Sequence, residues 1–311
     1  MNYRECANLL RQQDHFLIVT HKNPDGDTMS SAAALCSALR RLGKTAYLYP
    51  NMDVIRKLRP YVEPYFAAPD ITWKFCVSVD VATDGMFARG FSGKVDLCID
   101  HHPTNSHYAP RELIREEKSS CGEIILDLIK SLCGDVKQEE ATLLYIAVTT
   151  DTGCFQYANT SCQTLGAAAE LLRLGANSNV VIRDFFRKVS PARLKLEGMI
   201  YSNMSFHRGG WLAVAMITRE MMEKAGSTED DCDDLAGLCG RAEGSALNVT
   251  IRELEDGSSK VSVRSAPGIS SSDICAVFGG GGHDMAAGCT IQSPPAKAKE
   301  MLLAVIDEVC K

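Results

Sequence analysis

The sequence lacks any apolar run long enough to cross a membrane. Its longest apolar stretches, 141–149 and 212–217, fall far short of the roughly 20 residues that a transmembrane helix needs. Charged residues also occupy the N-terminal segment MNYRECANLLRQQD, where a secretory signal would have an apolar centre. We therefore expect no membrane association and a cytoplasmic protein.

Closely spaced cysteine pairs are missing too, although the chain has 13 cysteines. The nearest two, Cys232 and Cys239, are too far apart for a Cys-x-x-Cys motif. A zinc or redox site built on such a motif is therefore not expected. Scattered cysteines are typical of free thiols that pack as small apolar residues in a reducing compartment.

Excess positive charge is absent, because 39 acidic residues outnumber 33 Lys and Arg and give a formal net charge of −6. Tight binding of long nucleic acid depends mainly on many Lys and Arg contacts to phosphates. The charge balance therefore argues against attachment to long duplexes but allows a small anionic substrate. Divalent cations would reverse the local sign wherever acidic residues cluster.

The 311-residue chain is long enough for two domains. Apolar periodicity predicts an N-terminal α/β domain, 1–185, with a mainly parallel sheet flanked by helices. An acidic loop, HKNPDGDT, follows its first strand where a dinucleotide-binding fold would have a glycine fingerprint. The predicted strands are 16–21, 44–49, 75–81 and 95–100, and the predicted helices include 120–132, 138–149 and 161–174.

A different pattern follows a linker that we place at 186–200. Residues 201–311 are predicted to form a smaller α+β domain, with strands at 211–218, 248–254 and 260–265. The last two strands are expected to form a hairpin through Asp256 and Gly257. A glycine run at 279–282 and a helix from about Ala296 complete this domain.

Acidic and imidazole side chains gather at the ends of predicted elements of the first domain. A single Asp in such a place is usually a turn residue or a helix cap. Because the carboxyl ends of parallel strands meet at one edge of a sheet, however, we expect these side chains to lie together. They are His21, Asp25 and Asp27 after the first strand, Asp80 at the third, Asp100, His101 and His102 at the fourth, and Asp151 after the helix at 138–149.

So many carboxylates would repel one another without a counter-charge, and divalent cations are the simplest remedy. Carboxylates and imidazoles without a thiolate favour manganese over magnesium or iron. The groups are too many for one ion, and two ions roughly 3.5–4 Å apart would activate a hydroxide and neutralise charge on a phosphoryl group. The sequence therefore predicts a two-metal phosphoester hydrolase.

Five motifs in register, HKNPDGD, VSVDV, CIDHH, TTDTG and GGGGH, resemble those of the DHH phosphoesterase family. They span residues 21–283, and the last is similar to the DHH-associated C-terminal domain. The compact chain most resembles the bacterial branch of oligoribonucleases that degrade nanoRNA and also hydrolyse 3′-phosphoadenosine 5′-phosphate. The resemblance implies an enzyme that acts on short RNA or small nucleotides.

The resemblance also implies residue roles. Asp80 would bridge two ions, Asp100 would orient a metal-bound imidazole, and His102 would face the substrate phosphate as a donor or an acid. The first ion would be held by His21, Asp25 and Asp80, and the second by Asp27, Asp80, His101 and Asp151. The substrate phosphate would be bound by Arg264, Gly279, Gly280, Gly281, Gly282 and His283, with backbone N–H groups of the glycines as donors.

Several alternatives stay open. A phosphodiesterase for cyclic or linear dinucleotides uses the same chemistry, and a nucleotide or RNA sensor could occupy the same fold without catalysis. A homodimer is compatible with the sequence. Phe155 and Tyr157, which follow Asp151, are expected to pack in the core rather than to stack on nucleobases.

Overall fold

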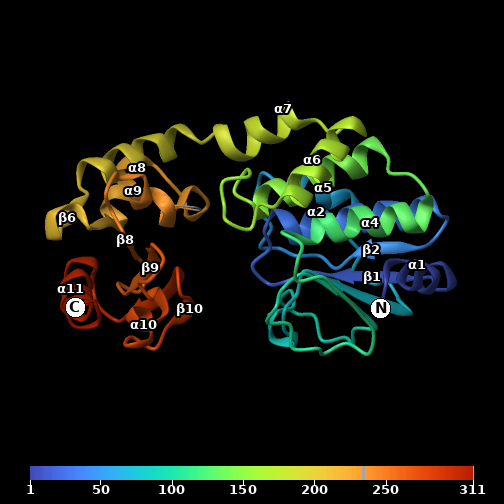
Figure 1. Cartoon of the computed structure of the whole chain (residues 1–311), viewed down its shortest axis with the longest axis horizontal. Coiled ribbons are helices and arrows are strands. Elements are labelled where there is room, and N and C mark those ends of the chain that lie inside the picture. Colours follow the sequence, from blue (N-terminus) through green and yellow to red (C-terminus); the bar gives the residue numbers. More distant parts are fainter. Residues whose placement is uncertain (233–234, 311) are drawn as a thin grey trace. The chain divides into compact units, whose positions relative to one another are not determined.

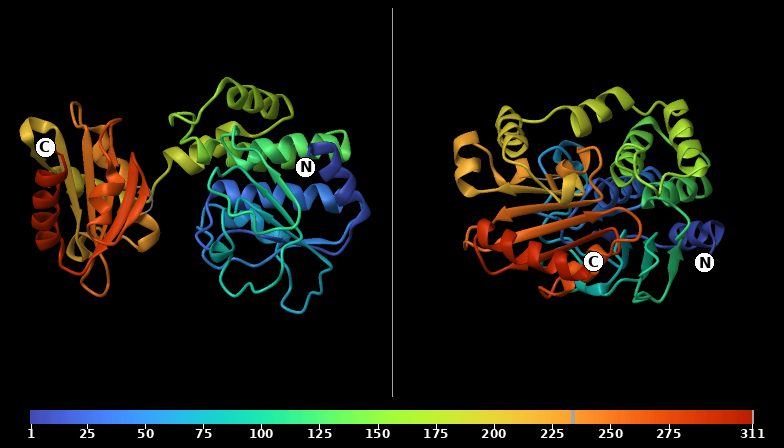
Figure 2. Two further views of the ribbon diagram at one scale, coloured as in Figure 1. Left: turned by 60° about the horizontal axis from the view of Figure 1, so that its bottom comes forward. Right: turned by 60° about the vertical axis from the view of Figure 1, so that its left-hand side comes forward.

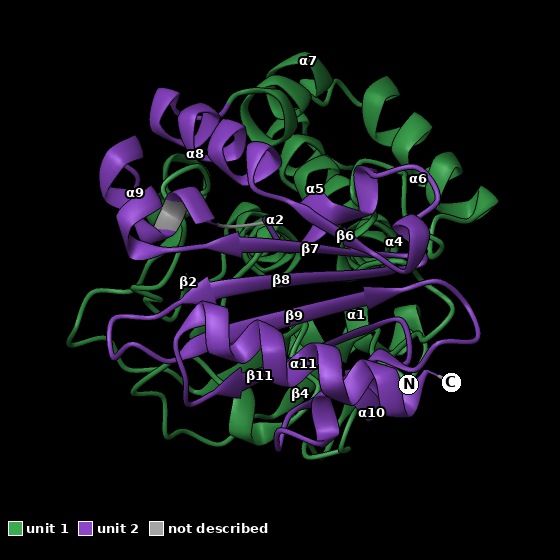
Figure 3. Ribbon diagram, turned by 90° about the vertical axis from the view of Figure 1, so that its left-hand side faces the viewer, with its two compact units in different colours: residues 1–188 green, residues 189–311 purple. Residues whose placement is uncertain are grey.

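Two compact units, residues 1–188 and 189–311, make up the chain (Figure 1, Figure 3). The structure, a computed structural model, describes residues 1–232 and 235–310. The boundary lies within the linker predicted at 186–200, although most of that stretch is helix α8 (Pro191–Ser202). Leu196 and Ile200 of α8 are fully buried in a core cluster of unit 2, so this helix belongs to the second unit.

Unit 1 contains the predicted parallel sheet. Its five strands lie in the order β2-β1-β3-β4-β5, and every neighbouring pair is parallel. The fifth strand was not predicted, because its short sequence, Glu-Leu-Ile, lies outside any longer apolar run. The strands are β1 (Phe16–Val19), β2 (Ala46–Leu48), β3 (Phe75–Val79), β4 (Leu97–Asp100) and β5 (Glu112–Ile114).

Helices α2, α4 and α5 lie over one face of this sheet (Figure 1), and their apolar side chains form its main core. The opposite face carries the smaller cluster around Val19, Cys76 and Cys98, which loop aromatics cover. Figure 2 shows the same layers from two further directions. The helices of unit 1 are α1 (Tyr3–Gln12), α2 (Gly26–Arg41), α3 (Arg59–Val62), α4 (Cys121–Cys133), α5 (Gln138–Asp151), α6 (Cys162–Arg173), α7 (Ser178–Val181) and the π-helix η3 (Ile182–Arg187).

Two helix boundaries differ from prediction in ways that bear on the acidic residues. Helix α2 begins at Gly26, inside the predicted loop, so Asp25 is its N-cap and Asp27 lies in its first turn. The side chain of Asp25 accepts a hydrogen bond from the backbone N–H of Thr28 (3.0 Å). Helix α5 continues two residues beyond the predicted end, so Asp151 is its last residue.

Close packing between α2 and α5 leads to a stability prediction. A Cβ atom on Gly26 would lie 2.3 Å from Oγ1 and 2.7 Å from Cβ of Thr150 on α5. We expect Gly26→Ala to push the helices apart and to lower the free energy of unfolding by about 1–3 kcal/mol, measured by urea titration. Gly166→Ala on α6 is the control, since its Cβ would meet no atom within 4 Å. Equal stability of both variants and the wild type would contradict this packing argument.

Unit 2 has a six-stranded mixed sheet in the order β10-β11-β9-β8-β7-β6 (Figure 3). Neighbours are antiparallel except β7 and β8, and β8 and β9 form the predicted hairpin through Gly257. The strands are β6 (Ser205–His207), β7 (Leu212–Ile217), β8 (Leu247–Glu253), β9 (Ser259–Ser265), β10 (Gly281–His283) and β11 (Ala286–Ile291).

Each face of this sheet has its own core. Helices α10 (Ser271–Ala276) and α11 (Pro295–Val309) pack on the face that carries Val261 and Val263. Helix α8, helix α9 (Arg219–Ala225) and the 3-10 turn η6 (Leu235–Arg241) pack on the opposite face of β7 and β8. No helix within the described residues is both long and apolar enough to span a membrane. All 13 cysteines are free.

Candidate metal centre

The six predicted metal ligands come together at the carboxyl edge of the parallel sheet of unit 1. They form overlapping groups whose ligand atoms lie within 4.8 Å of one another. One group is His21, Asp25 and Asp80, and another is Asp27, His101 and Asp151. The topology explains the clustering, because β1, β3 and β4 are adjacent parallel strands and α2 and α5 pack against each other.

Asp80 lies between the two histidines. Its Oδ2 is 3.6 Å from Nε2 of His21, and its Oδ1 is 3.4 Å from Nε2 of His101. Nε2 of His101 is also 3.8 Å from Asp151 and 4.0 Å from Asp27, and His21 is 3.7 Å from Asp25. Most of these separations exceed a hydrogen bond, so they leave space for a cation between the side chains.

Two buried atoms of this cluster have no hydrogen-bond partner in the part of the chain that the structure describes. They are Oδ1 of Asp80 and Nδ1 of His21. Asp80 is only 3% exposed and has a left-handed backbone, with φ of +61°, which is unfavourable outside glycine. A buried carboxylate oxygen without a hydrogen bond, on a residue with a left-handed backbone, fits a residue that binds a cation.

The electrostatics of the cluster show the same deficit of positive charge. Burial, together with the carboxylates of Asp80 and Asp151, raises the pKa of Asp27 well above its usual value. Burial also raises the pKa of Asp151 to about 7, although His101 opposes this shift. Burial disfavours protonation of His21 and His101, but the surrounding carboxylates outweigh it and raise both pKa values to about 10. Without cations, protons therefore neutralise this site.

Asp100 supports His102 rather than His101, which differs from the predicted role. Oδ1 of Asp100 is 2.8 Å from Nδ1 of His102, and its Oδ2 accepts a hydrogen bond from Asn105 (2.6 Å). Nδ1 of His101 instead donates to the backbone carbonyl of Lys118 (3.2 Å). Asp100 is fully buried and therefore fixes the ring of His102, whose side chain is 39% exposed. The hydrogen bond to Asp100 raises the pKa of His102 even though burial lowers it.

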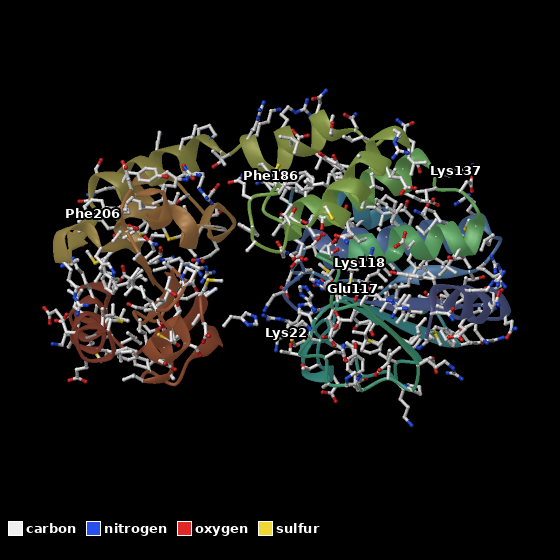
Figure 4. The ribbon with its side chains drawn as sticks, in the orientation of Figure 1. Lys22, Glu117, Lys118, Lys137, Phe186 and Phe206 are labelled. Carbon is white, nitrogen blue, oxygen red and sulfur yellow. The ribbon has the colours of Figure 1, made fainter. Side chains whose placement is uncertain are left out.

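The segment 118–122 supports the cluster and was missed by sequence reasoning. The N–H groups of Cys121 and Gly122 donate to the two oxygens of Asp27 (2.7 and 2.9 Å). The first residue of this segment is Lys118 (Figure 4), and its backbone carbonyl accepts the hydrogen bond from the ring of His101. The thiol of Cys121 also lies within 4.8 Å of carboxylate oxygens of Asp27 and Asp80. The available signal was the position of Cys121 directly after Ser120, a residue type that commonly caps helices.

Ser120 and Glu123 have the sequence spacing that predicts a capping box at the start of α4, but this box is only half formed. Ser120 accepts the hydrogen bond from the N–H of Glu123, as expected for a cap. The carboxylate of Glu123 turns instead to the N–H and hydroxyl of Ser119 and to the hydroxyl of Thr164. This arrangement ties α4 to α6 and holds the segment 118–122 in place.

In unit 2, Arg264 and His283 lie in one row of the sheet. Arg264 on β9 and His283 on β10 both pair with Ala286 of β11, so their side chains share one face on either side of a small residue. Both side chains are exposed. A cavity of about 420 Å³ next to this row is lined by Lys260, Ser262, Phe278, Gly279, Gly280, Gly288 and Thr290.

The glycine run is more structured than predicted. The N–H groups of Gly279 and Gly280 donate to the carbonyls of Ala276 and Cys275 at the end of α10 (2.9 and 3.0 Å). These two groups are therefore not available to a phosphate, contrary to expectation. Glycine is still required at position 280, because a Cβ there would lie 2.3 Å from the carbonyl oxygen of Gly288.

The chain matches the DHH family, N-terminal domain, over residues 15–148 and the DHHA1 domain over residues 210–311. The bifunctional oligoribonuclease and PAP phosphatase NrnA of Thermus thermophilus is 36% identical over 285 residues. That match covers 88% of this chain and 83% of the relative. The chain belongs to the DHH family. The predicted family, fold class and enzyme class, a phosphoester hydrolase, are thereby confirmed.

Solved structures of other proteins share the fold. An exopolyphosphatase-related protein from Bacteroides fragilis has a TM-score of 0.88 at 22% identity and covers 98% of this chain and 96% of its own. RecJ of Thermus thermophilus, solved in complex with Mn²⁺, has a TM-score of 0.56 at 16% identity. That likeness covers 98% of this chain and 54% of RecJ.

Proposed function

We propose that the protein hydrolyses short oligoribonucleotides and 3′-phosphoadenosine 5′-phosphate with the help of two divalent cations. The main support is the clustering of Asp80 with five other Asp and His side chains, in which Oδ1 of Asp80 has no hydrogen-bond partner among the described residues. The substrate choice is supported by the printed activity of the relative from Thermus thermophilus. The resemblance to the oligoribonuclease branch and the DHHA1 domain of unit 2 also support the substrate choice. A cytoplasmic location is part of the same proposal.

The proposed ligands divide into two overlapping sets that share Asp80. One set is His21, Asp25 and Asp80, and the other is Asp27, Asp80, His101 and Asp151. Manganese is the proposed metal because oxygen and imidazole donors without a thiolate suit it, and the fold-related RecJ has been solved with Mn²⁺. When bound, two such cations supply charge neutralisation at the phosphoryl group and lower the pKa of a water molecule.

Residues of the chain then bind and position the substrate. His102 is partly exposed, and its ring is fixed by Asp100 through Nδ1, so Nε2 is free to protonate or hydrogen-bond the leaving oxygen. Arg264 and His283 offer side-chain donors on one face of the sheet of unit 2 for a second phosphate of the substrate.

A substrate panel tests this function directly. We would assay 5′-labelled di- to decanucleotides, 3′-phosphoadenosine 5′-phosphate, cyclic dinucleotides and pyrophosphate with manganese and with a chelator. The proposal expects turnover of the shortest RNAs and of 3′-phosphoadenosine 5′-phosphate, and none with chelator. Preference for cyclic dinucleotides or pyrophosphate would overturn the substrate choice, and binding without turnover would favour a sensor.

Cation binding is expected to release protons. His21 and His101, with pKa values raised to about 10, are protonated at pH 8, whereas metal ligation requires neutral imidazole. Affinity for Mn²⁺ should therefore fall as the pH falls, and these two imidazoles should contribute roughly two released protons per protein at pH 8. Calorimetric titrations in two buffers of different ionisation enthalpy measure this release. His101→Asn should lower it by about one proton, and a heat independent of buffer would contradict the assignment.

Arg264→Ala should mainly weaken substrate binding. Loss of one charge-assisted hydrogen bond to a phosphate is worth about 1.5–3 kcal/mol, so KM should rise about 10- to 100-fold with a smaller change in kcat. Steady-state kinetics with 3′-phosphoadenosine 5′-phosphate measures both constants. Lys297→Ala is the control, because Lys297 is an exposed cation on α11, which covers the opposite face of the sheet. An unchanged KM for Arg264→Ala would remove this residue from the binding site.

A further inference from the structure

The loop that follows Asp151 has an unusual backbone. Helix α5 ends at Asp151, and Gly153, Cys154 and Phe155 then have φ values of +55°, +58° and +68°. Three consecutive residues in the left-handed region are unfavourable, and two of them are not glycine. Such strain persists only where the surroundings fix the backbone, and it is common at ligand-binding sites.

Hydrogen bonds fix this loop to the end of α5. The N–H groups of Gln156 and Tyr157 both donate to the carbonyl of Thr152 (2.9 and 3.0 Å). The side chain of Asn159 donates to the carbonyl of Asp151 (3.1 Å). Phe155 packs against the core of unit 1 with its ring near that of Tyr145. The loop is therefore held on both sides of Tyr157.

Tyr157 differs from its neighbour Phe155, although both were expected in the core. Its side chain belongs to the exposed large apolar residues and is 60% exposed. Its ring lies against the backbone of Gly153, where an added Cβ would come within 2.4 Å of two ring atoms. One part of the ring thus contacts Gly153, and the rest is exposed. The ring belongs to the short loop that follows Asp151.

We propose that Tyr157 is a stacking platform for a nucleobase of the substrate. This inference rests on the proposed function and adds a base-binding residue to it. An aromatic ring on a fixed loop loses little conformational freedom on binding, and every nucleobase has a π-face that can stack on it. Recognition of this kind is independent of base identity, which suits an enzyme that degrades short RNAs of any sequence.

The test compares substrates with and without a base. We would measure KM and kcat of the wild type, Tyr157→Ala and Tyr157→Phe with a diadenylate and with the same dinucleotide lacking one base. Stacking predicts that Tyr157→Ala raises KM for the diadenylate about 10- to 100-fold, whereas Tyr157→Phe stays near the wild type. The KM for the abasic substrate should be the same in all three proteins. Leu165→Ala, which removes another exposed apolar side chain of unit 1, is the control.

Two results would overturn the proposal. The first is an equal KM for the diadenylate in Tyr157→Ala and the wild type. The second is an equal loss on both substrates, which indicates a structural role for the ring, and thermal melting of Tyr157→Ala would check that role separately. If the wild type turned over neither substrate, the proposed function would fail. Calorimetric binding would then test the stacking role of Tyr157 separately. A wild type that binds adenosine 5′-phosphate no more tightly than ribose 5-phosphate rules out stacking.

Discussion

Replacing Asp80 by asparagine is expected to lower kcat by at least about a thousandfold, because catalytic cations supply several kcal/mol of transition-state stabilisation. Among the carboxylates that the structure describes, Asp80 is the one that lies within 4.0 Å of both His21 and His101, with a different oxygen toward each. Neutralising it would therefore weaken both proposed cation sites at once. The neighbouring carboxylates each belong to only one of the two proposed sets, so their loss should be milder.

Asparagine is the sharper substitution because the backbone of Asp80 is left-handed, a conformation that asparagine tolerates better than alanine. The side chain keeps its size in a position that is only 3% exposed. We would measure turnover of 3′-phosphoadenosine 5′-phosphate at saturating Mn²⁺, together with the number of ions bound. Asp70→Asn, an exposed carboxylate in a loop of the same unit, should behave like the wild type. If Asp80→Asn keeps most of its activity, Asp80 does not bridge two ions.

Much of the metal cluster could be predicted, because its side chains lie near the ends of strands and helices that the sequence pattern reveals. The buried strands β1, β3 and β4 are mostly apolar, Asp80 and His101 directly follow β3 and β4, and His21 follows β1 after Thr20. Parallel pairing then brings those positions to one edge, so the local pattern alone predicts that His21, Asp80 and His101 meet. The left-handed backbone of Asp80 has no such signal, since asparagine and aspartate occur in many turns.

Backbone contacts explain most of what could not be predicted. The N–H groups that hold Asp27 and the carbonyl that holds His101 come from the segment 118–122, and a peptide group is the same in every sequence. The hydrogen bonds from the N–H groups of Gly279 and Gly280 to the end of α10 could not be predicted for the same reason. Asp100 contacts the ring of His102 and also accepts a hydrogen bond from Asn105, and no periodicity in the sequence reveals either contact.

Replacing His102 by asparagine is expected to lower kcat about 10²- to 10⁴-fold, the range for loss of a general acid. The effect should be smaller on a substrate with an aryl leaving group, because such a group departs without a proton. His107→Asn is the matched control, since His107 is largely exposed and pairs with Glu112. Steady-state kinetics with 3′-phosphoadenosine 5′-phosphate and with an aryl phosphate measure the difference. An equal loss on both substrates would assign His102 to binding and not to proton transfer.

The pH profile separates the same two roles. Asp100 raises the pKa of His102, so the protonated acid persists to higher pH and kcat should fall only as the pH rises through that raised pKa. Asp100→Asn removes the main cause of the shift, and the decline in kcat should therefore begin at lower pH. The decline in kcat must shift to lower pH when the pKa is lowered, because a general acid is active only while it holds its proton. A decline that stays in place in Asp100→Asn would mean that another group donates the proton to the leaving oxygen.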